Sequence, residues 1–208
     1  MNEHRYIRFM PDNWLEPFAV EDLFPPGKPV EVDLGCGKGR FLLEHAERNP
    51  HINFLGVDRM LRRVRKVERA AIRRNLENVR VMRLDGYYAV AYLLPRARIS
   101  AYYIFFPDPW PKKKHHDNRL FNAHFLDALC QTLVPAGVLH FATDHLPYFE
   151  EVQALLQADP RFESIEPFIP PPEEKTDFER IFHDQPIGRC SFRMSQKKGG
   201  TLHEVPCH

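Results

Sequence analysis

The sequence predicts an α/β fold built around a mostly parallel sheet, and three observations lead to this prediction. Short apolar segments typical of buried strands alternate with longer segments of helical period. A glycine-rich turn at residues 35–39 joins the first such strand to the first such helix. Four of the strands end at or just before an aspartate, as expected of sheets that bind ligands beyond the carboxyl ends of their strands.

Length and composition indicate a single domain. The chain has 208 residues, of which 43% are apolar, enough for one sizeable core. We expect the domain at residues 30–194, an N-terminal arm at residues 1–29 and a disordered tail at residues 195–208. The 29 basic and 28 acidic residues leave a net charge of +1, so the total charge does not indicate a nucleic-acid partner.

The sequence also indicates the cellular compartment of the protein. No apolar run approaches the roughly 20 residues of a membrane span, and the first residues lack the apolar core of a secretion signal. The four cysteines are scattered without paired metal spacing, so we expect free thiols in a reducing compartment. We therefore expect a cytoplasmic protein with no membrane partner and no bound metal.

Residues 1–29 mix aromatic residues with prolines and show no period, which indicates an irregular arm packed on the domain. The pattern then changes to a strand at residues 30–34, the glycine-rich turn, and a helix at residues 40–48. This strand–turn–helix order is typical of the opening of a nucleotide-binding unit.

The spacing of the glycine turn discriminates between ligands. Dinucleotide sites use Gly-x-Gly-x-x-Gly, whereas here the third glycine comes one residue early and Asp33 lies two residues before Gly35. A carboxylate at that position repels pyrophosphate and attracts a cationic ligand. The form acidic-x-Gly-x-Gly-x-Gly resembles motif I of S-adenosylmethionine-dependent methyltransferases, in which Asp33, Gly35 and Gly37 would bind the cofactor. A dinucleotide site is the alternative.

The next two strands also lead to aspartates. A strand at residues 51–58 ends in Asp58, about 20 residues beyond the glycines, where acidic side chains accept hydrogen bonds from ribose hydroxyls. A strand at residues 79–84 is followed by Asp85, the position from which such enzymes commonly contact adenine. Each aspartate alone could instead be a helix N-cap, but together they favour a site.

The segment between these strands, residues 61–74, predicts an amphipathic helix. Its inner side would carry Leu61, Val64, Val67, Ala71 and Ile72. Its outer side would carry Arg62, Lys66, Arg69 and Arg73. Such a basic side is either an ordinary solvated surface or a contact for phosphates, and Glu68 is the acid that could offset it.

A predicted helix at residues 86–94 and a strand at residues 99–106 lead to the sequence Pro107-Asp108-Pro109-Trp110-Pro111. The prolines restrict the backbone on both sides of Asp108, which suits a carboxylate held beside a ligand. Trp110 could offer a stacking face or lie in the core. Lysines and histidines follow and would steer phosphates: Lys112, Lys113, Lys114, His115, His116 and Arg119.

The C-terminal third predicts a helix at residues 146–158 and strands at residues 162–165 and 189–194. A long proline-rich loop lies between these two strands. It would return residues 176–179 to the site, although a simple connector is the alternative.

Several motifs resemble the bacterial tRNA (guanine-N7-)-methyltransferase family, over residues 30–194. They are the sequence from Phe105 to Lys113, Phe141-Ala142-Thr143-Asp144 after the fifth strand, and Thr176-Asp177-Phe178-Glu179-Arg180. The resemblance implies a Rossmann-like class I methyltransferase with a mostly parallel seven-stranded sheet, an antiparallel edge strand and helices on both faces. One departure is that Asp117 and Asn118 interrupt the basic run.

The resemblance also implies roles for individual residues. Asp33, Asp58 and Asp85 would hold S-adenosylmethionine, and Asp108 would be the catalytic residue where cofactor and guanine meet. Contacts to tRNA would come from Lys112, Asp144, Thr176, Asp177, Phe178 and Glu179. The implied reaction is methyl transfer to N7 of a guanine in the tRNA variable loop. Methylation of another substrate, or tRNA binding without turnover, are the alternatives, and monomer or homodimer is left open.

Overall fold

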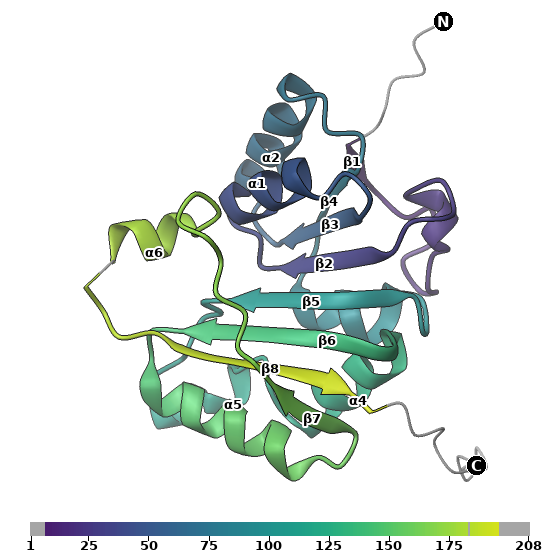
Figure 1. Ribbon diagram of the computed structural model, residues 1–208. Helices are drawn as coiled ribbons and strands as arrows, with labels where there is room; N and C mark the ends of the chain where they lie inside the picture. Colours follow the sequence, from purple (N-terminus) through teal and green to yellow (C-terminus); the bar gives the residue numbers. More distant parts are fainter. Residues whose placement is uncertain (1–6, 183, 196–208) are drawn as a thin grey trace, which may run out of the picture.

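A computed structural model of the chain describes residues 7–182 and 184–195, which form an eight-stranded sheet flanked by helices (Figure 1). The strand order is β1-β4-β3-β2-β5-β6-β8-β7. The first six in this order run parallel, whereas β8 is antiparallel to both of its neighbours. The strands are β1 (Arg8–Phe9), β2 (Val30–Leu34), β3 (Asn53–Asp58), β4 (Val79–Arg83), β5 (Ile99–Phe105), β6 (Leu133–Thr143), β7 (Phe162–Ile165) and β8 (Gly188–Met194).

The predicted α/β fold is confirmed, but the predicted number of seven strands is wrong. The additional strand is β1, in which Arg8 pairs with Val81 and Phe9 with Met82 of β4. A two-residue strand is too short to show a periodic pattern, so the segment was predicted to be irregular. Residues 141–143, predicted to follow the fifth strand, are instead the last residues of β6. Apart from Ser195, the predicted tail lies outside the described residues.

Helices cover both faces of the sheet, as predicted. They are α1 (Arg40–Arg48), α2 (Leu61–Arg73), α3 (Gly86–Tyr88) continued by a π-helical turn (Ala89–Leu93), α4 (Ala123–Thr132), α5 (Leu146–Ala158) and α6 (Asp177–Ile181). Short 3-10 turns lie at Val20–Asp22 and Lys113–Asn118. None of the described helices is long and apolar enough to cross a bilayer.

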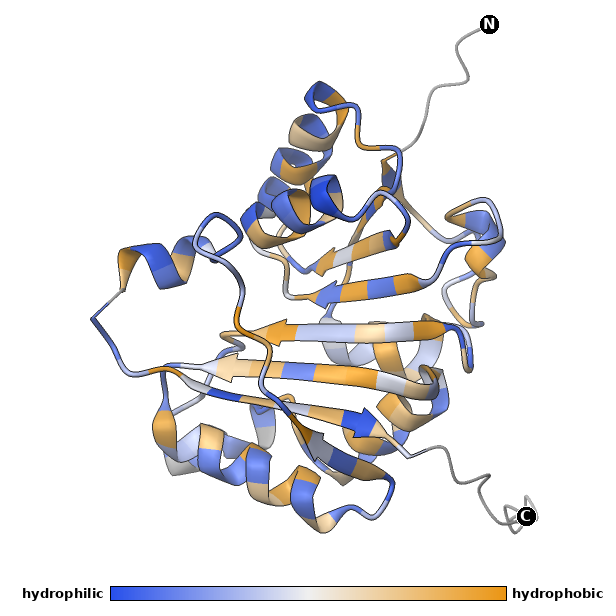
Figure 2. Cartoon of the chain, in the orientation of Figure 1, coloured by the Kyte–Doolittle hydropathy of each residue, from blue (hydrophilic) through white to orange (hydrophobic). Residues whose placement is uncertain are grey.

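The core has two layers because successive strand residues point to opposite faces of the sheet. In β5, Tyr102 and Ile104 pack toward α4 and α5, while Tyr103 and Phe105 pack toward α1. Many residues of β5 and β6 are hydrophobic, and the helices carry both hydrophobic and hydrophilic residues (Figure 2). Packing on both faces holds the parallel strands in place, and the carboxyl ends of these strands form the site.

The inner side of α2 is mostly as predicted. Val64, Val67 and Ala71 are fully buried, but Ile72 is 55% exposed, so its predicted inward position is wrong. At about 100° per residue, Ile72 lies about 140° around the helix from Val67, outside the stripe that faces the sheet.

Gly39 allows α1 and α2 to approach each other closely. Its φ is +78°, and an added Cβ would lie 2.6 Å from Cγ2 of Val67. Both the left-handed backbone and the absence of a side chain are therefore required at the start of α1.

We predict that Gly39→Ala lowers the free energy of unfolding by about 2–5 kcal/mol, the sum of a left-handed backbone and an overpacked contact. Gly37→Ala is the matched control, since Gly37 has φ +58° and its nearest neighbour would lie 3.9 Å from the new Cβ. In the control, the free energy of unfolding should fall only by the cost of the left-handed backbone, about 1–2 kcal/mol. Urea unfolding measures both, and equal losses would contradict the packing argument.

Candidate functional site

Two adjoining cavities open at the carboxyl ends of the parallel strands. Their volumes are about 680 Å³ and 280 Å³. The residues that line both, and so join them into one crevice, are Gly35, Arg63, Phe105 and Phe106. The larger cavity is lined by Asp58, Asp85 and Asp108, and the smaller by Asp33. The structure therefore brings the predicted aspartates of β2, β3, β4 and β5 to one crevice.

Asp33 is a buried carboxyl group that faces the smaller cavity. It is 4% exposed and forms no ion pair with another described residue. Burial raises the pKa of Asp33 to about 8, and the nearby charge of Asp58 contributes to the same shift. The group therefore keeps its proton near neutral pH until a cation approaches it.

Asp58 connects the glycine turn to α2. One carboxylate oxygen accepts hydrogen bonds from the backbone N–H of Gly37 at 3.0 Å and from Nη1 of Arg63 at 3.3 Å. The other accepts from the backbone N–H of Met60 at 2.7 Å. A carboxylate has about four acceptor positions, so this buried group retains capacity for a ligand.

Asp85 lines the same cavity as Pro107 and Asp108 of the proline turn. Its side chain is the N-cap of α3 and accepts from the backbone N–H of Tyr88 at 3.1 Å. The residue is exposed at the wall of the cavity. The N-cap role and a ligand contact are therefore compatible.

Asp108 is an exposed carboxylate at the wall of the larger cavity. Its side chain is 66% exposed, and one oxygen lies 3.1 Å from Nη2 of Arg59. The turn is constrained at both ends, because Phe106 and Trp110 have φ of +53° and +44°. Such left-handed backbone at non-glycine residues costs roughly 1–3 kcal/mol and concentrates at functional sites. Together with the prolines, it fixes where Asp108 projects.

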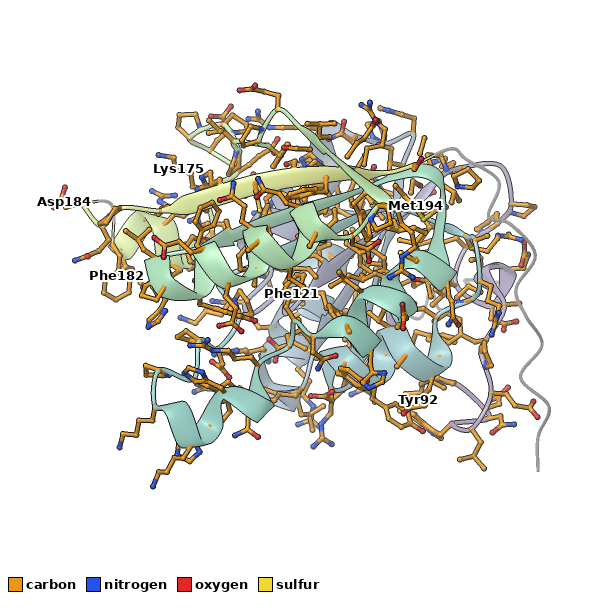
Figure 3. The ribbon with its side chains drawn as sticks, turned by 90° about the horizontal axis from the view of Figure 1, so that it is seen from below. Tyr92, Phe121, Lys175, Phe182, Asp184 and Met194 are labelled. Atoms are coloured by element: carbon orange, nitrogen blue, oxygen red, sulfur yellow. The ribbon has the colours of Figure 1, made fainter. Side chains whose placement is uncertain are left out.

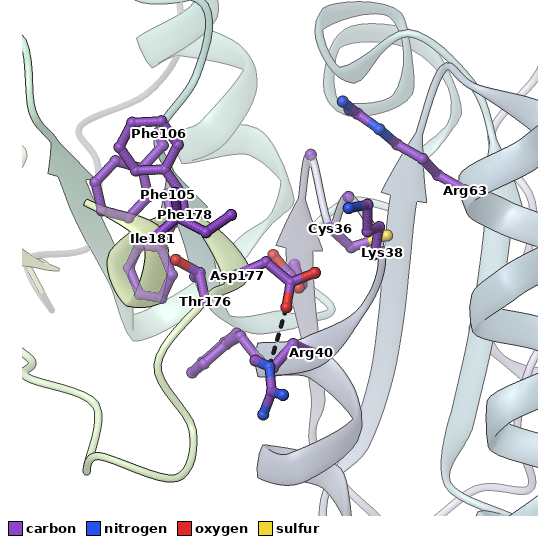
Figure 4. A pocket seen from close by; sticks show the side chains of 14 residues that line it. Cys36, Lys38, Arg40, Arg63, Phe105, Phe106, Thr176, Asp177, Phe178 and Ile181 are labelled. Atoms are coloured by element: carbon purple, nitrogen blue, oxygen red, sulfur yellow. Dashed lines mark hydrogen bonds and ion pairs between the residues drawn. The ribbon is translucent and has the colours of Figure 1, made fainter. Parts of the chain in front are cut away.

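The segment around α6 forms one wall of the smaller cavity (Figure 4). Asp177 pairs with Arg40 of α1 at 3.0 Å, the contact drawn as a dashed line. Phe178 stacks on Phe106 with ring centroids 4.6 Å apart. Lys175, Phe182 and Asp184 gather at one end of the molecule, with Met194 toward the other (Figure 3). The loop between β7 and β8 therefore returns to the crevice.

The sequence comparisons agree with this geometry. A family model described as "Putative methyltransferase" matches residues 27–185. A tRNA (guanine-N(7)-)-methyltransferase from Halorhodospira halophila is 40% identical over 166 residues, covering 77% of this chain and 72% of the relative. The chain belongs to this methyltransferase family. A relative of the same name from Rubrobacter xylanophilus is 33% identical and covers 91% of this chain and 80% of its own length. The resemblance drawn from the motifs is confirmed.

Solved methyltransferase structures share the fold of this family member. The 16S rRNA methyltransferase KamB superposes with a TM-score of 0.61 at 16% identity, over 81% of this chain and 88% of that chain. The antibiotic-resistance methyltransferase Kmr gives 0.57 at 19% identity, over 85% and 90%. The Rossmann-like class I architecture is thereby confirmed.

The predicted tRNA contacts of the methyltransferase lie in different places. Thr176, Asp177 and Phe178 line the smaller cavity. Lys112 is exposed just beyond the proline turn, and Asp144 follows β6 without lining either cavity. These roles stay predictions.

Glu179 has partners within the protein. It is 2% exposed, completes a capping box with Thr176, and pairs with Arg189 of β8. These contacts fix α6 on the sheet, which the Thr-x-x-Glu spacing could have indicated. Its predicted contact with tRNA stays a prediction.

Arg119 was predicted to steer phosphates; the structure places it at the wall of the larger cavity with partners inside the protein, and the phosphate role stays a prediction. Its side chain is 5% exposed, donates to the carbonyl of Pro109 at 2.9 Å and pairs with Glu151. It also lies over the ring of Tyr148. The side chain of Arg119 therefore stabilises the proline turn through its hydrogen bond to the carbonyl of Pro109.

Other crevice residues were missed by sequence reasoning. Arg59 follows Asp58 directly, so its place at a strand end was the available signal. Arg40 is the first residue of α1, just after the glycine turn, and Phe106 directly follows the last residue of β5. The pairing of these residues with Asp108, Asp177 and Phe178 depends on contacts distant in sequence, which no local pattern predicts.

We predict that Phe178→Ala loosens α6, because the ring loses its stacking on Phe106 and on Phe182, whose centroid lies 4.5 Å away. At about 0.5–1.5 kcal/mol per aromatic pair, amide hydrogen exchange in α6 should rise on the order of tenfold. Ile181→Ala is the control, since Ile181 is in the same helix and 67% exposed. Equal exchange in both variants would argue against the stack as the anchor.

Proposed function

We propose that this chain transfers the methyl group of S-adenosylmethionine to N7 of a guanine in tRNA. The observation that carries the proposal is the crevice itself, where aspartates from four adjacent strands surround two joined cavities. Relatives that are up to 40% identical carry the name of this activity.

The residues present fit this cofactor, which supplies an electrophilic methyl group on a sulfonium. Asp33 is a buried acid without a cationic partner among the described residues, and it would face the positive charges. Asp58 would accept hydrogen bonds from the ribose hydroxyls, and Asp85 from the adenine amino group. The glycine turn at Gly35 and Gly37 leaves the backbone open to the ligand.

Guanine N7 has a free lone pair and carries no proton, so Asp108 need not act as a base. As positive charge develops on the guanine ring, a fixed carboxylate nearby stabilises it. The same carboxylate could accept hydrogen bonds from N1–H and N2–H of guanine and thereby exclude adenine. Holding N7 in line with the methyl group supplies the remaining acceleration, up to about 7–11 kcal/mol in well-aligned reactions.

The target is best placed in a loop of the tRNA. N7 faces the deep, narrow groove of an RNA helix, which side chains do not reach, whereas a loop nucleotide can be unstacked at modest cost. The variable loop meets this condition. Reaction on tRNA in a reducing cytoplasm is consistent with Cys36, Cys130 and Cys190 as free thiols.

The direct test is incubation of the protein with S-adenosylmethionine and tRNA that lacks N7-methylguanine, followed by chemical cleavage specific to that nucleotide. We expect one cut, in the variable loop. Methyl incorporation without this cut would favour another substrate, and tRNA binding without methyl incorporation would favour a binding module. Either result would overturn the proposal.

We predict that Asp108→Asn lowers kcat by roughly 10²–10³, the effect of removing one group that stabilises transition-state charge. Cofactor affinity should change little, because cofactor binding rests on the other three aspartates. Single-turnover methylation and calorimetry measure the two effects. Asp127→Asn, an exposed aspartate of α4, is the control. Near-normal rates in Asp108→Asn would remove Asp108 from the reacting centre.

We predict that cofactor affinity rises with pH up to about 8. Because the pKa of Asp33 is raised to about 8, the free protein holds a proton there at pH 7, and binding of a cation must release it. Calorimetry in two buffers of different ionisation enthalpy should show this release between about pH 6 and 8. Asp33→Asn should bind more weakly and without proton release. Wild-type binding without proton release would contradict the assignment of Asp33.

A further inference from the structure

The outer side of α2 carries four cations that no described acid neutralises. Arg62, Lys66, Arg69 and Arg73 are all exposed, and none forms an ion pair within the described part of the chain. At 3.6 residues per turn they follow one another along one side of the helix. We call these four residues the basic row.

Acids within α2 and in the adjacent α1 have other partners. Glu68, the acid within α2, lies 3.9 Å from Arg8. Glu44 and Glu47 of α1 both pair with Arg74, which follows α2. The charge of the basic row is therefore not offset locally, although the whole chain has a net charge of only +1.

The basic row is held in a fixed orientation. The opposite side of α2 is fully buried at Val64, Val67 and Ala71, so the helix cannot turn without exposing core. At a rise of 1.5 Å per residue, the row extends about 16 Å from Arg62 to Arg73. The backbone positions of the four cations are therefore fixed relative to the core.

The row begins at the crevice. Arg59 and Arg63, immediately before and within the first turn of α2, line the larger cavity. On the other side of that cavity, Lys112 and Lys114 are exposed beyond the proline turn that carries Asp108. Cations therefore lie on both sides of the place where a nucleotide would enter.

We propose that the basic row binds the sugar–phosphate backbone of the substrate tRNA beside the guanine that enters the crevice. This inference rests on the proposed function and adds the surface by which the polynucleotide is held. An acidic protein would also be attracted to the row, but only a polynucleotide can occupy the crevice and follow the row away from it. Contacts of this kind position the RNA and do not read its sequence.

The test replaces all four residues of the row with Gln in the full-length protein and measures tRNA binding across a series of salt concentrations. Each phosphate contact contributes about 0.7–0.9 to the slope of log affinity against log salt. Loss of four contacts should make the slope shallower by about 3 and weaken binding on the order of tenfold or more at about 0.1 M salt. KM for tRNA should rise more than kcat falls, with cofactor affinity unchanged.

The matched control also replaces four exposed cations with Gln, at Lys28, Arg96, Arg98 and Arg193, toward the amino ends of the parallel strands. It changes the net charge equally and should keep the wild-type slope. A second variant, Arg62→Lys with Arg69→Lys and Arg73→Lys, preserves the charge of the row. It should also keep the wild-type slope of log affinity against log salt.

The outcomes separate this proposal from the proposed function. A row variant with wild-type affinity and slope, or a control variant with an equal loss, would overturn the role of the row. If the wild-type protein binds tRNA but makes no N7-methylguanine, the proposed function fails. The salt series would still show whether the basic row binds tRNA. Thermal unfolding of each variant confirms that the fold is intact.

Discussion

The buried carboxylate of Asp58 joins the segments that shape the crevice. It accepts hydrogen bonds from the glycine turn after β2 and from the first residues before and within α2. Because hydrogen bonds to a buried charge are among the strongest in proteins, this group fixes the glycine turn relative to β3. The same contacts set where α2 begins, and hence the line of the basic row. The glycine turn and α2 therefore share one anchor.

A second set of contacts places the distant α6 segment. Glu174, just before α6, lies 2.7 Å from Nδ1 of His45 in α1, whose Nε2 lies 3.1 Å from the hydroxyl of Tyr103. That hydroxyl donates to Glu31 at 2.9 Å, and burial raises the pKa of Glu31. Buried polar networks of this kind specify one arrangement, because each unpaired member would be costly. Since α1 starts at the glycine turn, α6 is positioned by the same element that borders the smaller cavity.

Local sequence patterns predicted the elements well and their long-range partners poorly. The alternation of strands and helices was sufficient to predict a parallel sheet, and parallel pairing then required the four aspartates to share one edge. The buried position of Arg119 depends on Glu151, which is 32 residues away, and no periodicity reports such a pair. The strand β1 was missed because two residues carry no pattern. Residues that bridge separate elements are thus where sequence reasoning failed.

Asp33 and Asp108 are suited to different ligands because of their exposure. The buried carboxyl group of Asp33 can meet a ligand only through the smaller cavity that it lines. Asp108 can be reached by a macromolecule, and its pairing with Arg59 is between two exposed side chains, a kind of contact worth about 0–1 kcal/mol. In the proposed reaction, a guanine edge would meet the carboxylate of Asp108 and a phosphate would meet the guanidinium of Arg59. Because the ion pair is weak, Asp108 and Arg59 would each exchange the other for the RNA at little cost in free energy. The ion pair would therefore not block access of the RNA to the crevice.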